Sequence, residues 1–457
     1  MLRKYSRRMG ILFGLCLAAW ASYAQYAVTG GAGTPLLAKD DTYNDIQVYL
    51  VYGMNNVEIS YTSASASHQW YRYKTAYLQS EKIESIQNGT TSSIRNVEEG
   101  YGYYVEEADK MKKFVWIIDY SRYAFDVSSL QVVDTGDPCS SLQLEGQGHA
   151  PYMYYYTPAG LKTPLQRVGT VSYHTLEWSE ESGLFSNKEV VQEMNIVPEG
   201  ESSFRLAAPN ASSPLKAPLQ DTEITLKGDE FARHFNVEKT ARVAEYVAVA
   251  VELHADTVLV DSEALNMSSG NAGYSAPATL TFTAVANDPV ASLYIWTIYK
   301  SEEGGEDHPI LRFTGNEVDY TFNNAGKYVA RAEVSDRSGV CSDSFEYEIQ
   351  IAESYLDVPN VFSPGMSPGI NDEFKVAYKS LVRFKAWIFN RWGQELFHWT
   401  DPSKGWDGKK GGKYVPPGVY YYVIEAEGSD GLKYKKAGDI NILRSKTIQT
   451  EIIDDTK

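Results

Sequence analysis

The sequence is poor in cysteine, which limits how its domains can be stabilised. Only three of its 457 residues are cysteines. Cys16 lies in a predicted leader, so Cys139 and Cys341 alone remain, in segments that we expect to belong to different domains. Two cysteines exclude a disulfide framework of the kind that holds small secreted domains together. A single bridge between two domains stays open at this point.

Patterns of catalysis and metal binding are scarce as well. The sequence has no phosphate-binding P-loop and no dinucleotide-binding glycine fingerprint. Its seven histidines are scattered, with no HExxH and no His-x-His pair. We therefore predict no catalytic residue, no metal and no cofactor, and a protein that is not an enzyme. A carbohydrate-active enzyme stays open as a less favoured alternative, because glycosidases need only two carboxylates and 59 acidic residues supply them.

Basic residues are too few for a nucleic-acid-binding protein. The chain has 42 Lys and Arg against 59 Asp and Glu, a net charge of −17. Four of the basic residues and none of the acidic ones lie in the predicted leader, which leaves 38 against 59 and a net charge of −21. A chain of this charge repels the phosphate backbone and anionic lipid, so we predict no nucleic-acid partner.

Long hydrophobic runs are also missing. Outside the N-terminus no run of 18 apolar residues occurs, so no membrane-spanning helix is predicted. At the N-terminus, basic residues precede a short apolar run at 11–19, and small residues at 22–24 precede Gln25. This pattern is typical of a secretory signal peptide at 1–24.

Apolar residues with a helical period of 3.6 are rare, whereas tyrosine and glycine are abundant, with 34 and 35 residues. This composition predicts an all-β fold. The best exception is 75–87, where Leu78, Ile83 and Ile86 fit a short amphipathic helix, with a loop as the alternative.

The chain that follows the leader is too long for one hydrophobic core. Runs of strand-like residues between turn clusters predict tandem immunoglobulin-like β-sandwich modules at 25–132, 133–260 and 261–354. A smaller, seven-stranded β-sandwich follows at 355–444, and an acidic tail at 445–457.

The third module carries a recognisable pattern. Tyr320, Phe322, Gly326, Tyr328 and Val329 follow the order Y-x-F-x-x-x-G-x-Y-V, and a Val-Ser-Asp triplet follows at 334–336. This segment is similar to PKD domains. The resemblance implies an immunoglobulin-like spacer or interaction module.

The last module has the densest hairpin signals. In the segment 381–389, alternate residues are apolar, as in a half-buried strand, and a turn of Asn390, Arg391, Trp392 and Gly393 returns the chain to 395–398. A Gly-Trp-Asp-Gly turn at 405–408 and a Pro-Pro-Gly turn at 416–418 precede a strand at 419–427. Two further strands are expected at 432–438 and 439–443.

These segments, read as PNVFSP, NDEFKV, FNRWGQELF, GWDGK, PPGVYYYVI and DINILR in order, resemble the gliding-motility-associated C-terminal domain, the type B sorting domain of the type IX secretion system. The resemblance implies export across the outer membrane to the cell surface or medium, with the translocon and its associated outer-membrane proteins as partners. The residues that we expect to serve recognition are Asn390, Arg391, Trp392, Gly393, Trp406, Asp407, Gly408, Pro417 and Gly418.

The main hypothesis is an exported, non-catalytic surface or secreted protein with a binding, adhesion or structural role. Its rival is an accessory outer-membrane component of the secretion or gliding machinery. Two features leave a ligand open. The tyrosine run at 152–156 suits a surface glycan or a protein. Asp40, Asp41, Asp372, Glu373 and Asp407 could hold calcium, although a turn-capping role is favoured for Asp407.

Overall fold

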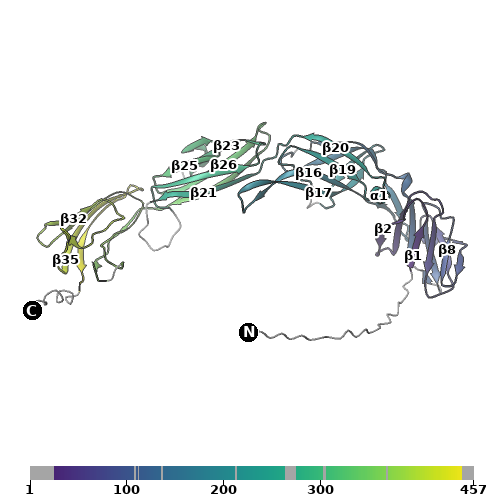
Figure 1. Ribbon diagram of the computed structural model, residues 1–457, viewed down its shortest axis with the longest axis horizontal. Helices are drawn as coiled ribbons and strands as arrows, with labels where there is room; N and C mark the ends of the chain where they lie inside the picture. The colour runs from purple at the N-terminus through teal and green to yellow at the C-terminus, as the bar shows by residue number, and fades with distance from the viewer. Residues whose placement is uncertain are drawn as a thin grey trace, which may run out of the picture.

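The computed structural model describes residues 25–107, 110–111, 113–134, 137–210, 214–262, 274–301, 305–366 and 369–444. The predicted signal peptide and acidic tail lie outside these ranges. Four β-sheet units follow one another along an arc, from the purple N-terminal end to the yellow C-terminal end (Figure 1). The all-β prediction is confirmed, since the described chain holds a single α-helix, α1 (Glu230–His234). Within the same ranges, no helix combines the length and apolarity needed to cross a membrane.

The first unit is built in layers around one central sheet. Its outer sheet has the order β1 (Gln25–Thr29), β4 (Glu58–Thr62), β8 (Thr91–Ile94), β7 (Ile86–Asn88). The central sheet has the order β2 (Leu36–Asp41), β3 (Ile46–Val51), β11 (Phe114–Asp119), β9 (Gly102–Glu107), β5 (Gln69–Tyr73), β6 (Glu81–Ile83), and β10 (Lys110–Met111) pairs with β9. β3 and β11 are parallel, and every residue of β11 is buried. A strand apolar on both faces needs a cover on both sides.

The second cover comes from later in the chain. One face of the central sheet packs on the outer sheet, through Trp70 and its neighbours. The other face packs against the hairpin of β14 (Met153–Tyr156) and β15 (Lys162–Leu165) and against α1. The predicted boundary at 132/133 falls inside β12 (Asp126–Val133), which belongs to the second unit, so the two units divide near residue 125 and share this core.

The helix expected at 75–87 is absent, and this prediction is wrong. A 3₁₀ turn (Tyr77–Gln79) is followed by β6 and β7 instead. Leu78 is 81% exposed, so the apolar residues there do not share a buried face. Pairing of β6 with β5 and of β7 with β8 outweighs the weak helical pattern.

The second unit is one strongly curled sheet. Its order is β12 (Asp126–Val133), β13 (Gln143–His149), β18 (Ser203–Ala207), β17 (Leu184–Pro198), β16 (Arg167–Ser179), β19 (Thr222–Gly228), β20 (Lys239–Tyr246). The two outermost strands, β12 and β20, lie against each other, so the sheet nearly closes around its core.

A buried ion pair fixes the second unit to the first. Arg167 of β16 donates to Asp229 at 2.9 Å, and both side chains are almost fully buried. The hydroxyl of Tyr120, from the first unit, donates to the other Asp229 oxygen at 2.6 Å. Asp229 also caps α1 by accepting from the Ala232 amide. Removing either member of the Arg167–Asp229 pair leaves a buried charge without its counter-charge.

The third unit is a two-sheet sandwich. One sheet has the order β21 (Leu253–Ser262), β22 (Ala278–Ala286), β25 (Glu317–Phe322), and the other β24 (Leu311–Thr314), β23 (Ala291–Lys300), β26 (Gly326–Asp336), β27 (Ser342–Ile351). Trp296, Phe282 and Phe322 form the centre of the core between them. Tyr328, from the PKD-like pattern, packs on Phe322 with ring centroids 4.8 Å apart.

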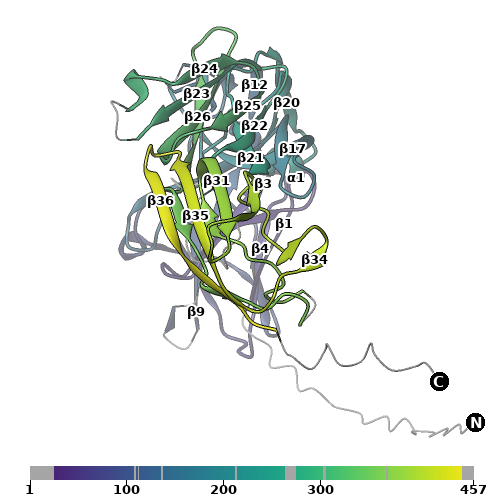
Figure 2. The ribbon, with the colours of Figure 1, turned by 90° about the vertical axis from the view of Figure 1, so that its left-hand side faces the viewer.

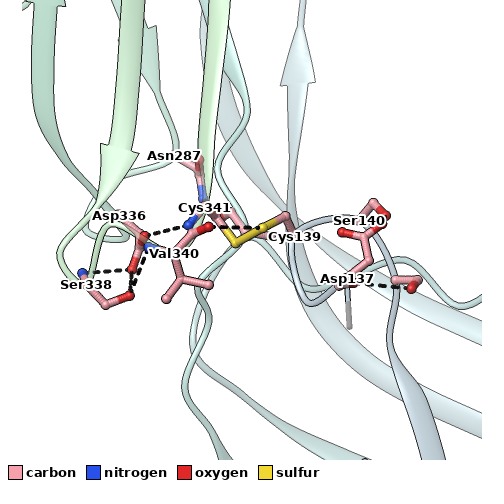
Figure 3. Close-up of a disulfide and its surroundings, with 10 residues drawn as sticks. Asp137, Cys139, Ser140, Asn287, Asp336, Ser338, Val340 and Cys341 are labelled. Atoms are coloured by element: carbon pink, nitrogen blue, oxygen red, sulfur yellow. Dashed lines mark hydrogen bonds between the residues drawn. A yellow bond between two sulfur atoms is a disulfide. The ribbon is translucent and has the colours of Figure 1, made fainter. Parts of the chain in front are cut away.

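A disulfide joins the second and third units, the bridge between two domains that the sequence analysis left open. Cys139, in the loop after β12, is bonded to Cys341, the residue before β27, across 202 positions of sequence (Figure 3). Next to it, the Asn287 amide donates to the carbonyl oxygens of Leu219 at 2.8 Å and Ala250 at 2.9 Å. The second and third units are therefore joined covalently and by hydrogen bonds of a buried side chain.

The fourth unit is built on a five-stranded sheet of order β29 (Val361–Phe362), β36 (Lys433–Ile442), β35 (Gly418–Gly428), β31 (Leu381–Phe389), β32 (Glu395–Trp399). Two small ladders complete it, β28 (Tyr355–Asp357) with β30 (Ala377–Lys379) and β33 (Lys409–Lys410) with β34 (Lys413–Tyr414). The described residues hold nine strands where seven were expected, because the sequence signals missed the shortest ones. The two strands expected at 432–438 and 439–443 form one, β36, which pairs with β35 along its whole length.

Buried serines lock the third unit to the fourth. Ser380 of the fourth unit accepts a hydrogen bond from the Ala276 amide at 3.0 Å through its hydroxyl, and its own amide donates to Ser275 at 2.7 Å. The Ser380 hydroxyl donates in turn to the Ala352 carbonyl at 2.7 Å. These contacts lie at the end of the sheet where Leu381 pairs with Gly428.

Candidate functional site

The residues predicted for recognition lie on the fourth unit, and strand register shows at which end. Phe389, the last residue of β31, pairs with Tyr421, and Gly418, the first residue of β35, pairs with Ile442 near the end of β36. The turn at 390–393, Pro417 and Gly418 therefore share one end of the five-stranded sheet. We call it the distal end, because the joint with the third unit lies at the opposite end. Figure 2 views the molecule from the side of the fourth unit, with β31, β35 and β36 near the viewer.

The turn at 390–393 is rigidly held and presents two large side chains. The Asn390 side-chain oxygen accepts from the amides of Trp392 and Gln394, both at 3.0 Å. Gly393 has a φ of 78°, which glycine adopts without steric cost. Trp392 is 75% exposed. The Arg391 guanidinium lies over the Trp392 ring, 4.2 Å from its centroid.

This stacking bears on the role of Arg391. A guanidinium over an exposed indole gains about 0.5–1 kcal/mol, which orders both side chains without neutralising the charge. Packing over Trp392 and recognition of a partner are compatible roles for Arg391, because the stacked arginine is still exposed to solvent. Recognition by Arg391 stays a prediction.

Trp406, Asp407 and Gly408 have a different position, inside the domain. Trp406 is completely buried, and its indole nitrogen donates to the Lys409 carbonyl at 2.8 Å. Asp407 accepts from the Lys409 amide at 3.0 Å, so it caps the turn. Gly408 has a φ of 74°, and a Cβ there would lie 2.9 Å from Pro364. These three residues shape the turn that leads into the β33–β34 ladder, and a partner molecule cannot reach the Trp406 ring.

Basic side chains gather at the distal end, although the chain as a whole is acidic, and one of them, Lys409, is ion-paired with Asp407 at 3.0 Å. The Lys410 ammonium donates to the Glu395 carbonyl at 3.2 Å, which places the β33–β34 ladder beside the turn at 390–393. Arg444 and Lys409 both lie over the Tyr414 ring, at 4.3 and 4.8 Å from its centroid. A carboxylate of Asp407 next to Lys409 raises the pKa of that lysine, so its charge is secure at neutral pH.

The sequence analysis missed this basic cluster. Its members are Arg391, Lys409, Lys410, Lys413 and Arg444. The signal was present as the run GKKGGK at 408–413, which stands out in a chain of net charge −17. Only the structure shows that Arg391 and Arg444, which are far away along the chain, lie at the same end of the sheet. A cluster of this kind suits an acidic partner surface.

Pro417 and Gly418 open the strand β35 beside the chain end. Pro417 lines a shallow pocket of about 300 Å³ together with Ser363, Met366, Leu443 and Arg444. The preceding carbonyl, of Pro416, accepts from the Tyr420 hydroxyl at 2.8 Å. The pocket is small and open, and its apolar lining suits a side chain of a protein partner.

The other ligand candidates are engaged in local contacts. Asp40 and Asp41 bond to Lys113 and Asn44, and Asp372 accepts from the amides of Gly365 and Gly369. Within the described residues no three His, Cys, Asp or Glu side chains come together as metal ligands.

The tyrosine run divides between core and surface. Tyr155 is buried in the first unit, whereas Tyr152 and Tyr154 are exposed, with ring centroids 5.6 Å apart. The Lys162 ammonium lies over the Tyr154 ring at 4.0 Å. This pair is the aromatic surface that remains for a ligand of the N-terminal half.

One segment has the G-x-S-x-G spacing of a hydrolase nucleophile, at 365–369. Its serine lies outside the described residues. A nucleophile elbow is a turn between a strand and a helix. Here the next regular element along the chain is the strand β30, so the context of an elbow is not met.

Comparison with known families identifies two of the four units. Residues 356–442 match the CHU_C type IX secretion signal domain, and residues 131–243 match a fibronectin type III domain. The chain therefore carries a type IX secretion signal domain at its C-terminal end and a fibronectin type III domain upstream, which confirms the predicted sorting domain and an immunoglobulin-like class. The fibronectin match falls on the second unit, so the likeness of the third unit to PKD domains stays a prediction.

Comparisons over the whole chain are weaker. No curated protein sequence matches this one. Among solved structures, a tetra-tandem repeat from the extending region of a large adhesion protein is 11% identical, covers 87% of this chain and 99% of its own, and has a TM-score of 0.22. The BSP domain of a biofilm-associated protein is 9% identical, covers 98% and 100%, and has a TM-score of 0.18. TM-scores this low do not indicate a shared arrangement of domains.

Proposed function

We propose that this chain is an exported, non-catalytic β-protein that the type IX secretion machinery recognises at the distal end of the fourth unit. A signal domain of this type implies export to the cell surface or secretion. The observation that carries the proposal is the exposed, ordered pair Arg391 and Trp392 within a basic cluster, at the end of the sheet that faces away from the rest of the chain.

The remaining units serve a binding or structural role. Each of them has a core, the first two also share one, and the joints between the units are buried and hydrogen-bonded. Joints of this kind favour a stiff spacer over a set of independently moving domains. The exposed pair Tyr152 and Tyr154 is the surface that we assign to a glycan or protein ligand.

Export of point variants tests the recognition step. Arg391→Ala and Trp392→Ala remove the two exposed side chains of the turn and should leave the domain folded but trapped in the periplasm. Arg383→Ala is the matched control. This arginine is exposed too, but it lies on β31 near the end opposite to the turn, where it pairs with Glu427. Normal export of both turn variants would show that recognition lies elsewhere.

Truncation tests the signal domain as a whole. Removal of residues 358–457 should leave the first three units folded in the periplasm, because the cut follows β28 of the fourth unit and removes no strand of the first three units. Export of the truncated chain would contradict the sorting role. Cell fractionation separates the two functional classes: release or surface protease sensitivity supports an exported cargo, and stable co-purification with the translocon supports the accessory component.

A further inference from the structure

The disulfide does more than join two neighbouring units, because of where it lies along the chain. Cys139 comes shortly after β12, the first strand of the second unit. Cys341 comes directly before β27, the last strand of the third unit. The bridge therefore offers a covalent route that leaves out the 201 residues between them, 140–340.

This covalent route begins at the joint between the first and second units and ends at the joint between the third and fourth units. Phe125, which precedes β12, donates its amide to Tyr120 at 3.1 Å, at the joint between the first and second units. Ala352, which follows β27, accepts from the Ser380 hydroxyl at the joint with the fourth unit. Along the backbone, a pull on the two ends of the molecule enters at the first point and leaves at the second. The joint contacts of Asp229, α1 and Ser275 lie in the bypassed segment and carry load only until those joints open.

We infer that the disulfide is a tension-bearing link that carries load past the bulk of the second and third units. The loaded path consists of β12, the loop to Cys139, the bridge, and β27. Both strands are fully extended already, and each lies at the edge of its sheet within its backbone ladder. An extended strand lengthens very little when it is pulled, so its ladder to the neighbouring strand stays in register.

The lengths show how large the effect is. From Asp126 to Cys139 and from Cys341 to Ile351 the path contains 14 and 11 residues. At about 3.5 Å per residue, these 25 residues reach at most about 90 Å. Without the bridge, the sequence separation of 202 between the two cysteines would add about 700 Å of extensible chain. The strands β13 to β26, which hold the fibronectin type III core except for the β12 residues Val127 and Leu130, lie outside the covalent path.

Such a link has a use in a protein that is held at one end and bound at the other. The source of the tension rests on the proposed surface role, but the force path itself follows from covalent connectivity. An oxidising compartment such as the periplasm permits the bridge to form before the chain reaches the surface. The second and third units would then keep their binding surfaces folded while the molecule is stretched.

Single-molecule stretching of the chain from Gln25 to its C-terminus, held at its two ends, tests the inference. The oxidised protein should reach its limit about 700 Å short of the Cys139→Ser, Cys341→Ser variant, which releases that length as the second and third units unfold. Full extension of the oxidised protein would overturn the inference, since the bridge would then not carry the load.

Reduction of the bridge in a molecule held under load tests the shielding directly, and it does not depend on whether the serine variant folds. Cys139 is half-buried, so a small thiol or phosphine can reach its end of the disulfide. If the two units are still folded, the chain should lengthen in separate unfolding steps after reduction. A single immediate jump of about 700 Å would show that they had unfolded inside the loop, and would refute the shielding. Because purified protein is used, failure here leaves the export proposal untouched, and a failure of export leaves this result untouched.

Discussion

Replacement of Trp406 by alanine should unfold the signal domain. The Trp406 ring is completely buried and packs against Phe362 and Tyr420, each with ring centroids 5.7 Å away. Truncation of a buried tryptophan costs about 3–5 kcal/mol in the free energy of unfolding. The lost indole hydrogen bond, which leaves the Lys409 carbonyl without its donor, adds about 1 kcal/mol. A domain of this size has a total stability of about 4–13 kcal/mol, so the loss is a large part of it.

Calorimetry of the mature chain, with limited proteolysis to assign the transition, measures this effect. Trp392→Ala is the matched control: it removes the same side chain from the same domain, but from a position that is 75% exposed. Its expected cost is below about 1 kcal/mol, the value of its contact with Arg391. A Trp406→Ala domain that melts at the wild-type temperature would refute the packing argument, as would equal destabilisation by the two variants.

Three further predictions concern the turn at 405–408 and the joint between the first two units. Gly408→Ala should destabilise the signal domain by about 1–3 kcal/mol, because its φ is positive and a Cβ would meet Pro364, whereas Gly411→Ala, with open space around it, should cost less in the same thermal melt. Arg167→Met should cost about 3–5 kcal/mol in urea unfolding, because it leaves the Asp229 charge buried and unpaired; a neutral result would show that the pair is dispensable. Burial, aided by the charge of Asp229, raises the pKa of Glu230 from 4.5 to about 7, so the stability of this joint should be full below pH 4.5 and decline as the pH rises to 7. Glu230→Gln should remove that slope, and an unchanged slope would exclude this carboxyl as its cause.

Local pattern was enough to place many strands. The alternation in Leu381–Phe389 predicted this strand with the bounds that the structure gives. It failed at 75–87, where three apolar residues at near-helical spacing were outweighed by pairing with distant strands. A periodicity reports one segment at a time, and it contains no information on the partner strand.

The joints and the distal end could not be predicted, for a related reason. Cys139 and Cys341 are 202 positions apart, and nothing in their spacing says that they meet. The covering of the first unit by Met153 and Leu165 depends on which face of a later hairpin turns inward. At the distal end, the motif residues were recognisable, but only strand register separates the exposed Arg391 and Trp392 from the buried Trp406.

The layered core of the first unit has a consequence for the order in which the chain folds. Phe231 and Ala232 of α1 are buried against the face of its central sheet, roughly 200 residues after β1. As an exported protein, the chain folds after it crosses the inner membrane, and strands β1 to β11 cross before this cover does, so the apolar face of β3 and β11 is exposed until the cover arrives. Such an exposed sheet face is prone to aggregate. We therefore expect the N-terminal half to depend on a periplasmic holding chaperone until residue 235 has crossed, and a mature chain truncated near residue 150 to be less soluble than one truncated near residue 250.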